Sequence, residues 1–230
     1  PRLPLGHRSL TDVNQSNLGC NEMYSLIGDG AQTLVLGSGT YVFGTAFSGT
    51  DSIGDTTLRQ QNANNNYGSN TNMRVGRQGT SWSKLHRAAI RFNLTNIPER
   101  AVVSNAQIRL YFYDIPGSDV TSNVEIGAHR VQQDPGRDWG ELTATWNEYN
   151  ETSWTTAGGD FISGASDVIN ISSAEEDDYV YFNVTDDVAN FVVNRSLNFG
   201  WILKPVDESE GKTRRYFRTK EHSTVSQRPV

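Results

Sequence analysis

The sequence has a single cysteine, Cys20, among its 230 residues, so the chain cannot form an internal disulfide. Its four histidines, His7, His86, His129 and His222, are scattered, and no pair has the spacing of a zinc site. No run of about 18 apolar residues is present. The sequence therefore predicts neither a disulfide framework, nor a zinc centre, nor a membrane-spanning helix.

Basic residues are too few and too dispersed to form a nucleic-acid-binding stripe. The formal net charge is −6, and the basic cluster KTRR at 212–215 closely follows the acidic segment DESE at 207–210. A negatively charged chain repels the phosphate backbone of DNA or RNA. The sequence therefore predicts no nucleic-acid partner.

Motifs that identify common enzyme classes are missing as well. The chain lacks a Gly-x-Ser-x-Gly nucleophile elbow, a phosphate-binding loop and a dinucleotide-binding fingerprint. No pair among its 26 acidic residues stands out as glycosidase carboxylates. We therefore expect no enzymatic activity and no cofactor. Calcium is an alternative at the acidic run of Glu175, Glu176, Asp177 and Asp178, where an exposed loop is the simpler interpretation.

Asparagine is abundant, and six Asn-x-Ser/Thr triplets are present. They begin at Asn14, Asn93, Asn150, Asn170, Asn183 and Asn194. Such triplets are acceptors of N-linked glycans in secreted proteins, which points to an archaeal or eukaryotic source. Some arise by chance in a chain rich in Asn and Thr, but six together predict an extracellular, cell-surface glycoprotein.

Short β-strand patterns, separated by turn residues, run from residue 55 to the C-terminus. In the segment 102–115, Ile108, Leu110 and Phe112 alternate with residues of a second face, which is the period of a half-buried strand. The segment DVANFVVNRS (187–196) instead has apolar residues at helical spacing and predicts one short helix. Many short strands with almost no helix are typical of an all-β sandwich.

The order of short motifs from residue 55 onward resembles the DNRLRE family, which is also described as disaggregatase-related. The matching pieces are NNNYGSNTNMRVG (64–76), RAAIRFNLTNIP (87–98), VVSNAQIRLY (102–111), IGAHRV (126–131), DWGELTATWN (138–147), VYFNVTDDVANFVVN (180–194), NFGWILK (198–204) and YFRTKE (216–221). Some members of that family are classed as carbohydrate-binding modules. The resemblance implies a jelly-roll-like antiparallel β-sandwich from secreted or cell-surface proteins and polysaccharide-degrading enzymes, without catalytic activity of its own.

The resemblance divides the chain into an N-terminal extension, 1–54, and a sandwich domain, 55–230. A carbohydrate-binding module is one interpretation, because aromatic rings in loops stack on sugars and arginines attract acidic polysaccharides. We expect Trp139, Trp146 and Trp201 to lie in the core, since large aromatic residues dominate burial in a sandwich. The sugar-binding candidates are Trp82 and Trp154, in loops rich in Gly, Ser and Thr, together with Arg74 and Arg77.

The other interpretation is a structural subunit, and we place it first. Family members usually continue into one more strand after the Arg-Pro pair, whereas this sequence stops at Val230. The extension carries a spare, uncharged, strand-like segment at 33–47, whose proposed donor residues are Leu34, Val35, Leu36, Tyr41, Val42 and Phe43. A strand donated from one copy to the sheet of the next would build a head-to-tail filament or sheath without disulfides. The alternative is that this segment folds back on its own domain.

Overall fold

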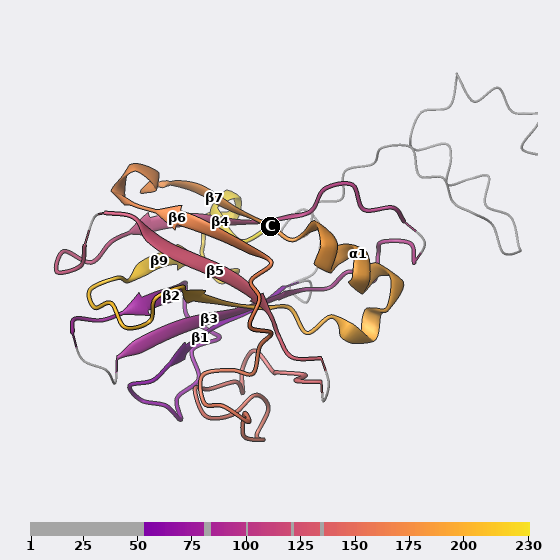
Figure 1. The fold of residues 1–230 in the computed structure, drawn as a ribbon, viewed down its shortest axis with the longest axis horizontal. Helices are drawn as coiled ribbons and strands as arrows, with labels where there is room; N and C mark the ends of the chain where they lie inside the picture. The colour runs from indigo at the N-terminus through magenta and orange to yellow at the C-terminus, as the bar shows by residue number, and fades with distance from the viewer. Residues whose placement is uncertain (1–52, 81–83, 100, 121, 134–135) are drawn as a thin grey trace, which may run out of the picture.

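The computed structural model describes residues 53–80, 84–99, 101–120, 122–133 and 136–230 (Figure 1). The donor segment 33–47, Trp82 and Asn14 lie outside these residues. The strands are β1 (Ile53–Arg59), β2 (Asn72–Arg77), β3 (Leu85–Phe92), β4 (Gln107–Asp114), β5 (Val124–Arg130), β6 (Asp167–Ile171), β7 (Asp178–Asn183), β8 (Trp201–Pro205) and β9 (Arg215–Arg218). The helix α1 spans Thr185–Val193, and short 3-10 turns occupy Ser173–Glu175, Arg195–Leu197 and Val225–Gln227.

All strand pairs are antiparallel, and they follow the order β6-β5-β8-β3-β2-β9-β4-β7, with β1 paired to β3. The last two residues of β2, Gly76 and Arg77, pair with β3 and so join two layers. We call the layer of β1, β3, β8, β5 and β6 sheet A, and the layer of β2, β9, β4 and β7 sheet B. At the far edge, the Asn183 N–H of β7 donates to the Asp167 carboxylate of β6 at 2.7 Å. The sheet is therefore nearly closed into a barrel-like sandwich, which confirms the predicted fold class.

The main hydrophobic core lies between the two sheets. It includes Ile90 of sheet A and Met73, Leu110 and Phe217 of sheet B, all fully buried. Strand β4 alternates as the sequence predicts, because Ile108, Leu110 and Phe112 face this core while the residues between them are more exposed. Apolar burial on one face of each sheet supplies most of the driving force for this arrangement.

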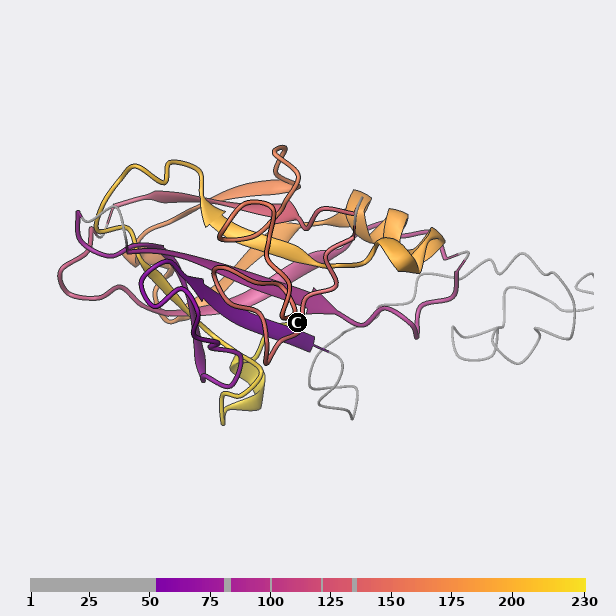
Figure 2. The same cartoon turned by 90° about the horizontal axis from the view of Figure 1, so that it is seen from below.

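The predicted helix is also present, at one end of the sandwich (Figures 1 and 2). Its buried face contains Val188, Phe191 and Val192, as their spacing predicts. Asp187, in the first turn, is buried and accepts hydrogen bonds from the Trp201 indole N–H at 2.7 Å and from the Ser166 hydroxyl. The helix is thus anchored to sheet A by a buried carboxylate as well as by apolar packing.

A second, smaller hydrophobic cluster covers the outer side of sheet A. There Leu58, Ala89 and Ile202 of the sheet pack beneath Trp139 and Trp146 of the long connection between β5 and β6. Figure 1 shows this connection looping beside β1 and β3. The prediction that Trp139, Trp146 and Trp201 belong to the core is confirmed, since each is less than a tenth exposed.

Candidate functional site

Arginine and tyrosine side chains alternate on the outer face of sheet B. The guanidinium carbon of Arg218 lies 3.5 Å from the Tyr113 ring centre, that of Arg109 lies 4.6 Å from the Tyr179 ring, and that of Arg74 lies 4.7 Å from the Tyr216 ring. These distances are typical of cation–π stacking. We call these six residues the arginine–tyrosine face.

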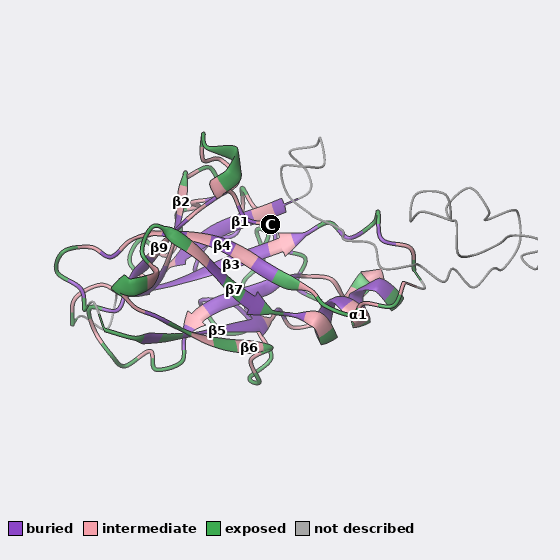
Figure 3. Cartoon of the chain, turned by 90° about the horizontal axis from the view of Figure 1, so that it is seen from above, coloured by how far each residue is buried: buried purple, intermediate pink, exposed green. Residues whose placement is uncertain are grey.

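The sheet places these residues side by side because of its register. Arg74 of β2 pairs directly with Tyr216 of β9, and β9 pairs in turn with β4. All six side chains are half-buried, and the Nε atoms of Arg109 and Arg218 have no hydrogen-bond partner among the residues that the structure describes. In Figure 3, β4 and β7 alternate between buried and more exposed residues, as expected for a sheet with one solvent-facing side.

Burial raises the pKa of Tyr113, while Arg218 opposes this rise and the charge of Asp114 adds to it. The Tyr113 phenol therefore stays protonated and uncharged at neutral pH, next to the Arg218 guanidinium group. The face combines positive charge, flat aromatic surfaces and phenol hydroxyl groups, which are the groups that recognise acidic sugars.

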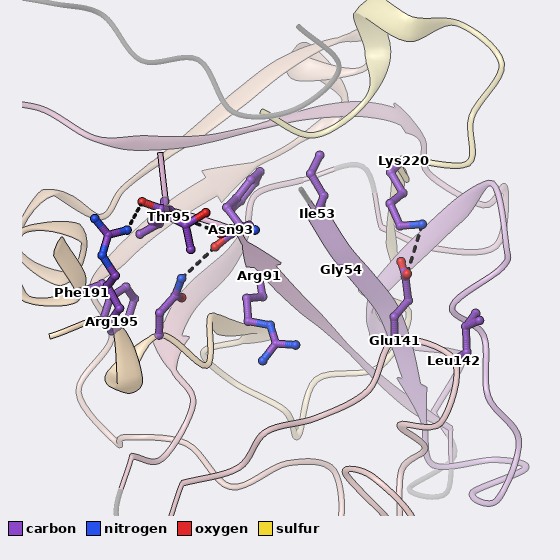
Figure 4. A pocket seen from close by; sticks show the side chains of 13 residues that line it. Ile53, Gly54, Arg91, Asn93, Thr95, Glu141, Leu142, Phe191, Arg195 and Lys220 are labelled. Atoms are coloured by element: carbon purple, nitrogen blue, oxygen red, sulfur yellow. Dashed lines mark hydrogen bonds and ion pairs between the residues drawn. The ribbon is translucent and has the colours of Figure 1, made fainter. Parts of the chain in front are cut away.

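A polar cavity of about 600 Å³ opens beside the start of β1 (Figure 4). Its lining includes Arg91 and Asn93 from the end of β3, Arg195 beside α1, and Glu141 and Lys220 from two loops. Figure 4 shows Glu141 and Lys220 pointing toward one another, and the distance from Lys220 Nζ to Glu141 Oε2 is 3.1 Å.

Two further carboxylates lie beside this pair. The Asp55 N–H donates to Glu141 Oε1 at 3.0 Å, and the Lys220 N–H donates to Asp55 Oδ2 at 2.9 Å. Lys220 Nζ also donates to Glu221 Oε1 at 2.5 Å. Asp55, Glu141 and Glu221 each offer one oxygen, and the three oxygens lie within 4.8 Å of one another. We call these three residues the carboxylate cluster.

The electrostatics of the cluster follow from its burial. Burial raises the pKa of Asp55 well above its usual range, and the charges of Glu221 and Glu141 raise it further, against the hydrogen bond from Lys220. Burial also raises the pKa of Glu141. For Lys220, burial by itself lowers the pKa, but hydrogen bonds to Glu221 and Glu141 outweigh it and the net pKa is raised.

The asparagine-rich loop 61–70 positions Glu141. Asn66 Nδ2 donates to the carbonyl oxygens of Glu141 and Ala144, both at 2.7 Å, while its Oδ1 accepts from the Gly68 N–H at 3.0 Å. A Cβ at Gly68 would lie only 2.2 Å from the Glu141 carbonyl oxygen, so this close approach requires glycine. The loop thus fixes the backbone from which Glu141 reaches β1.

The sugar-binding residues predicted from the sequence fare differently. Trp154 is only 5% exposed, and its indole N–H donates to the Thr145 carbonyl oxygen at 3.0 Å, so its ring offers no open face to a sugar. Arg77 is buried and donates to the Glu208 carbonyl oxygen, so packing removes it from a surface site. Arg74 does lie on the arginine–tyrosine face, and Trp82 lies outside the described residues.

The five described glycosylation candidates, Asn93, Asn150, Asn170, Asn183 and Asn194, are all exposed. Their occupancy stays a prediction. Two carboxylates of the acidic run at 175–178 form hydrogen bonds within the fold. Glu175 accepts hydrogen bonds from the Ser172 N–H and hydroxyl, and Glu176 accepts one from the Ile115 N–H. Within the described ranges, the carboxylates that converge on one point are those of the carboxylate cluster, not this run.

Residues 55–230 match the family model of the disaggregatase related repeat domain. The chain belongs to this family. The predicted family relationship is thereby confirmed over residues 55–230. A comparison with curated proteins finds no match. In the part of the repeat domain that the structure describes, no helix has the length and apolar character needed to cross a membrane.

Of the two sites of this repeat domain, the sequence predicts only Arg74 of the arginine–tyrosine face and no residue of the carboxylate cluster. The arginine–tyrosine face was visible as a period-two pattern, since Tyr216 and Arg218 alternate with buried neighbours. Aromatic residues in loops are a stronger sugar-binding signal in a sequence than this pattern, so the loop tryptophans are predicted instead. The carboxylate cluster had no such signal, because Asp55, Glu141 and Glu221 come from three separate segments that meet only in the tertiary structure.

Proposed function

We propose that this disaggregatase-related repeat domain is a non-catalytic, extracellular binding domain for acidic polysaccharide, and that the arginine–tyrosine face is its binding surface. The observation that carries the proposal is the stacking of Arg74, Arg109 and Arg218 on tyrosines of one sheet face. Stacking orients each guanidinium group while leaving N–H groups for a sugar carboxylate or sulfate. A charge-assisted pair of this kind is worth about 1.5–3 kcal/mol.

Binding measured by isothermal titration calorimetry with polygalacturonate and with neutral dextran tests this proposal. We expect binding of polygalacturonate that weakens as salt is raised, because the contacts are between charges. Replacing Arg218 by Gln should weaken binding about tenfold or more. Arg91→Gln is the matched control, since Arg91 is also half-buried but pairs with Asp138 beside sheet A.

Equal affinity for dextran, or unchanged affinity in the Arg218→Gln variant, would refute the assignment of this face. Unchanged affinity in Arg74→Gln would remove the β2 side from the site and leave β4 and β9. Because Arg74 and Arg218 are on the surface of sheet B, their variants are expected to keep the fold, which circular dichroism checks.

A second candidate function, assembly into a filament or sheath at the cell surface, has one observation in its favour. The Arg109 N–H donates to the Val230 carbonyl oxygen at 2.7 Å, and the Val230 N–H donates to the Arg109 carbonyl oxygen at 3.0 Å. Val230 of the same chain therefore already pairs in the antiparallel sense with this side of β4 at Arg109. In such a ladder, residues two apart direct their peptide groups to the same side, so Gln107 extends the same edge.

The proposed partner for this edge is the segment 33–47 of another copy. Replacing Leu34 and Leu36 by Asp should abolish assembly, as measured by size-exclusion chromatography with light scattering and by negative-stain microscopy. The same variant should keep its affinity for polygalacturonate. A wild-type protein that stays monomeric at high concentration would refute this second proposal and leave the first untouched.

A further inference from the structure

The carboxylate cluster contains buried oxygens that no group of the described residues satisfies. Asp55 is fully buried, and within the described ranges its Oδ1 has no hydrogen-bond partner. The same part of the structure offers no partner to Glu221 Oε2, which is also buried. A buried carboxylate oxygen that loses water without gaining a partner is costly, whether the acid is ionised or protonated. Asp55 Oδ1 and Glu221 Oε2 therefore each lack a favourable contact.

The charges of the cluster point to the missing partner. The ammonium of Lys220 contacts Glu141 and Glu221 and is the single cation in contact with the three carboxyl groups among the described residues, so a state with all three ionised would carry two uncompensated negative charges. Lys220 uses its contacts on Glu141 Oε2 and Glu221 Oε1, and its backbone N–H occupies Asp55 Oδ2. The two remaining oxygens, Asp55 Oδ1 and Glu221 Oε2, are the ones without a partner among the described residues. A divalent cation would balance the charge.

The size of the cluster fits one hard cation. Calcium binds oxygens at about 2.3–2.6 Å, so two oxygens on opposite sides of the ion are about 4.8 Å apart. The three carboxylates offer oxygens within 4.8 Å of one another. The adjoining polar cavity is lined by Glu141 and Lys220 of this region, so it lies next to the cluster. Magnesium demands a tighter and more regular shell, which side chains from one strand and two loops are less suited to supply.

We propose that Asp55, Glu141 and Glu221 form a calcium site that ties β1 to the loops carrying Glu141 and Lys220. The ion would link the first strand of the repeat domain to two segments that are distant in the sequence. The site stands apart from the arginine–tyrosine face, so its success or failure does not depend on the proposed sugar binding. Its effect is on the stability of the domain.

Differential scanning calorimetry of the full chain at pH 7, after treatment with EDTA, tests the site. Millimolar calcium should raise Tm by about 5 °C, whereas magnesium at equal ionic strength should have a much smaller effect. Asp55→Asn should abolish the calcium-dependent shift, and Glu221→Gln should weaken calcium binding at least tenfold by calorimetric titration. Glu221 is only partly buried, so this second variant keeps the test valid if Asp55→Asn folds poorly.

Asp178→Asn is the matched control, because Asp178 is an exposed carboxylate of the acidic run. It should leave the calcium shift intact. Lys220→Met separates the calcium site from a simple ion-pair cluster. Without its ammonium the cluster should bind calcium more tightly, and calcium should restore the stability that the substitution removes. No calcium shift in wild type, a shift retained by both Asp55→Asn and Glu221→Gln, or a Lys220→Met variant that calcium does not rescue would overturn the proposal.

Discussion

The outer faces of the two sheets differ in what covers them. On sheet A, Leu58, Ala89 and Ile202 lie beneath tryptophans of the β5–β6 connection, so its central strand β3 is buried on both sides. On sheet B, half-buried arginines and tyrosines occupy the corresponding positions. The same antiparallel scaffold thus supports a second core on one side and a polar, accessible surface on the other. Stability should therefore be concentrated at sheet A, and binding at sheet B.

The largest expected effect comes from removing a tryptophan above sheet A. Trp139 is only 1% exposed, and its indole N–H donates to the Phe199 carbonyl oxygen at 2.8 Å. Trp139→Ala should lower the free energy of unfolding by about 3–5 kcal/mol, through the cavity and the unpaired carbonyl oxygen. Urea denaturation measures this loss, and Tyr216→Ala on sheet B is the comparison. Equal losses at both positions would contradict the asymmetry.

Arginines on the two faces should also differ. On sheet A, Arg87 donates to both carboxylate oxygens of Glu208, at 2.7 and 2.8 Å, and to the Gly158 carbonyl oxygen at 2.9 Å, while it stacks on Trp146. Arg87→Met leaves Glu208 and the carbonyl oxygen without their donors. We expect a loss of about 2–3 kcal/mol in the free energy of unfolding, measured by urea denaturation.

The double variant with Glu208→Gln serves as the control for this prediction. If the ion pair is responsible, the two substitutions together should cost less than the sum of their separate effects. Strict additivity would show that Arg87 acts mainly through its packing on Trp146.

A pH effect is expected where the sheets join. Burial, helped by the charges of Arg59 and Arg74, lowers the pKa of His86 to about 3. The folded protein therefore keeps His86 neutral, whereas the unfolded chain protonates it near pH 6.5. Its contribution to stability is complete above that pH and is lost as the pH falls toward 3, by about 1.4 kcal/mol per pH unit.

His86→Gln should flatten this part of the pH profile of urea denaturation while leaving the region above pH 7 with the same slope. Burial also lowers the pKa of His129, so some slope should remain in the variant. An unchanged profile between pH 4 and 6.5 would show that His86 is not the group responsible.

Local patterns predicted much of the fold, because they report which residues face a core. The alternation of Ile108, Leu110 and Phe112 and the helical spacing of Val188 and Phe191 both survive in the structure. The covering of sheet A was not predictable in this way. Its tryptophans come from a turn-rich connection without periodicity. The sequence therefore predicts Trp154 to be a sugar-binding residue, whereas packing buries it in the structure.

Both sites show that local sequence patterns do not predict which residues meet or stay exposed in the tertiary structure. The period-two pattern identifies Tyr216 and Arg218 as sharing a face, but only the tertiary structure shows that this face stays uncovered. The carboxylate cluster depends on contacts between segments far apart in the chain. Asp55 meets Glu141 through a backbone hydrogen bond across the edge of β1, and no spacing rule anticipates such a contact.

The smallest expected effect on stability is at the open face, and it sharpens the comparison most. Arg218 stacks on Tyr113 at 3.5 Å and, within the described part of the chain, has no ion pair like that of Arg87 with Glu208. Arg218→Met should therefore lower the free energy of unfolding by only about 0.5–1 kcal/mol, the value of an exposed cation–π contact. The same variant should lose polygalacturonate binding, measured by calorimetry. A surface that serves to bind a ligand contributes little to the stability of the fold when the ligand is absent. A loss of stability as large as that of Arg87→Met would therefore mean that the arginine–tyrosine face stabilises the sheet instead.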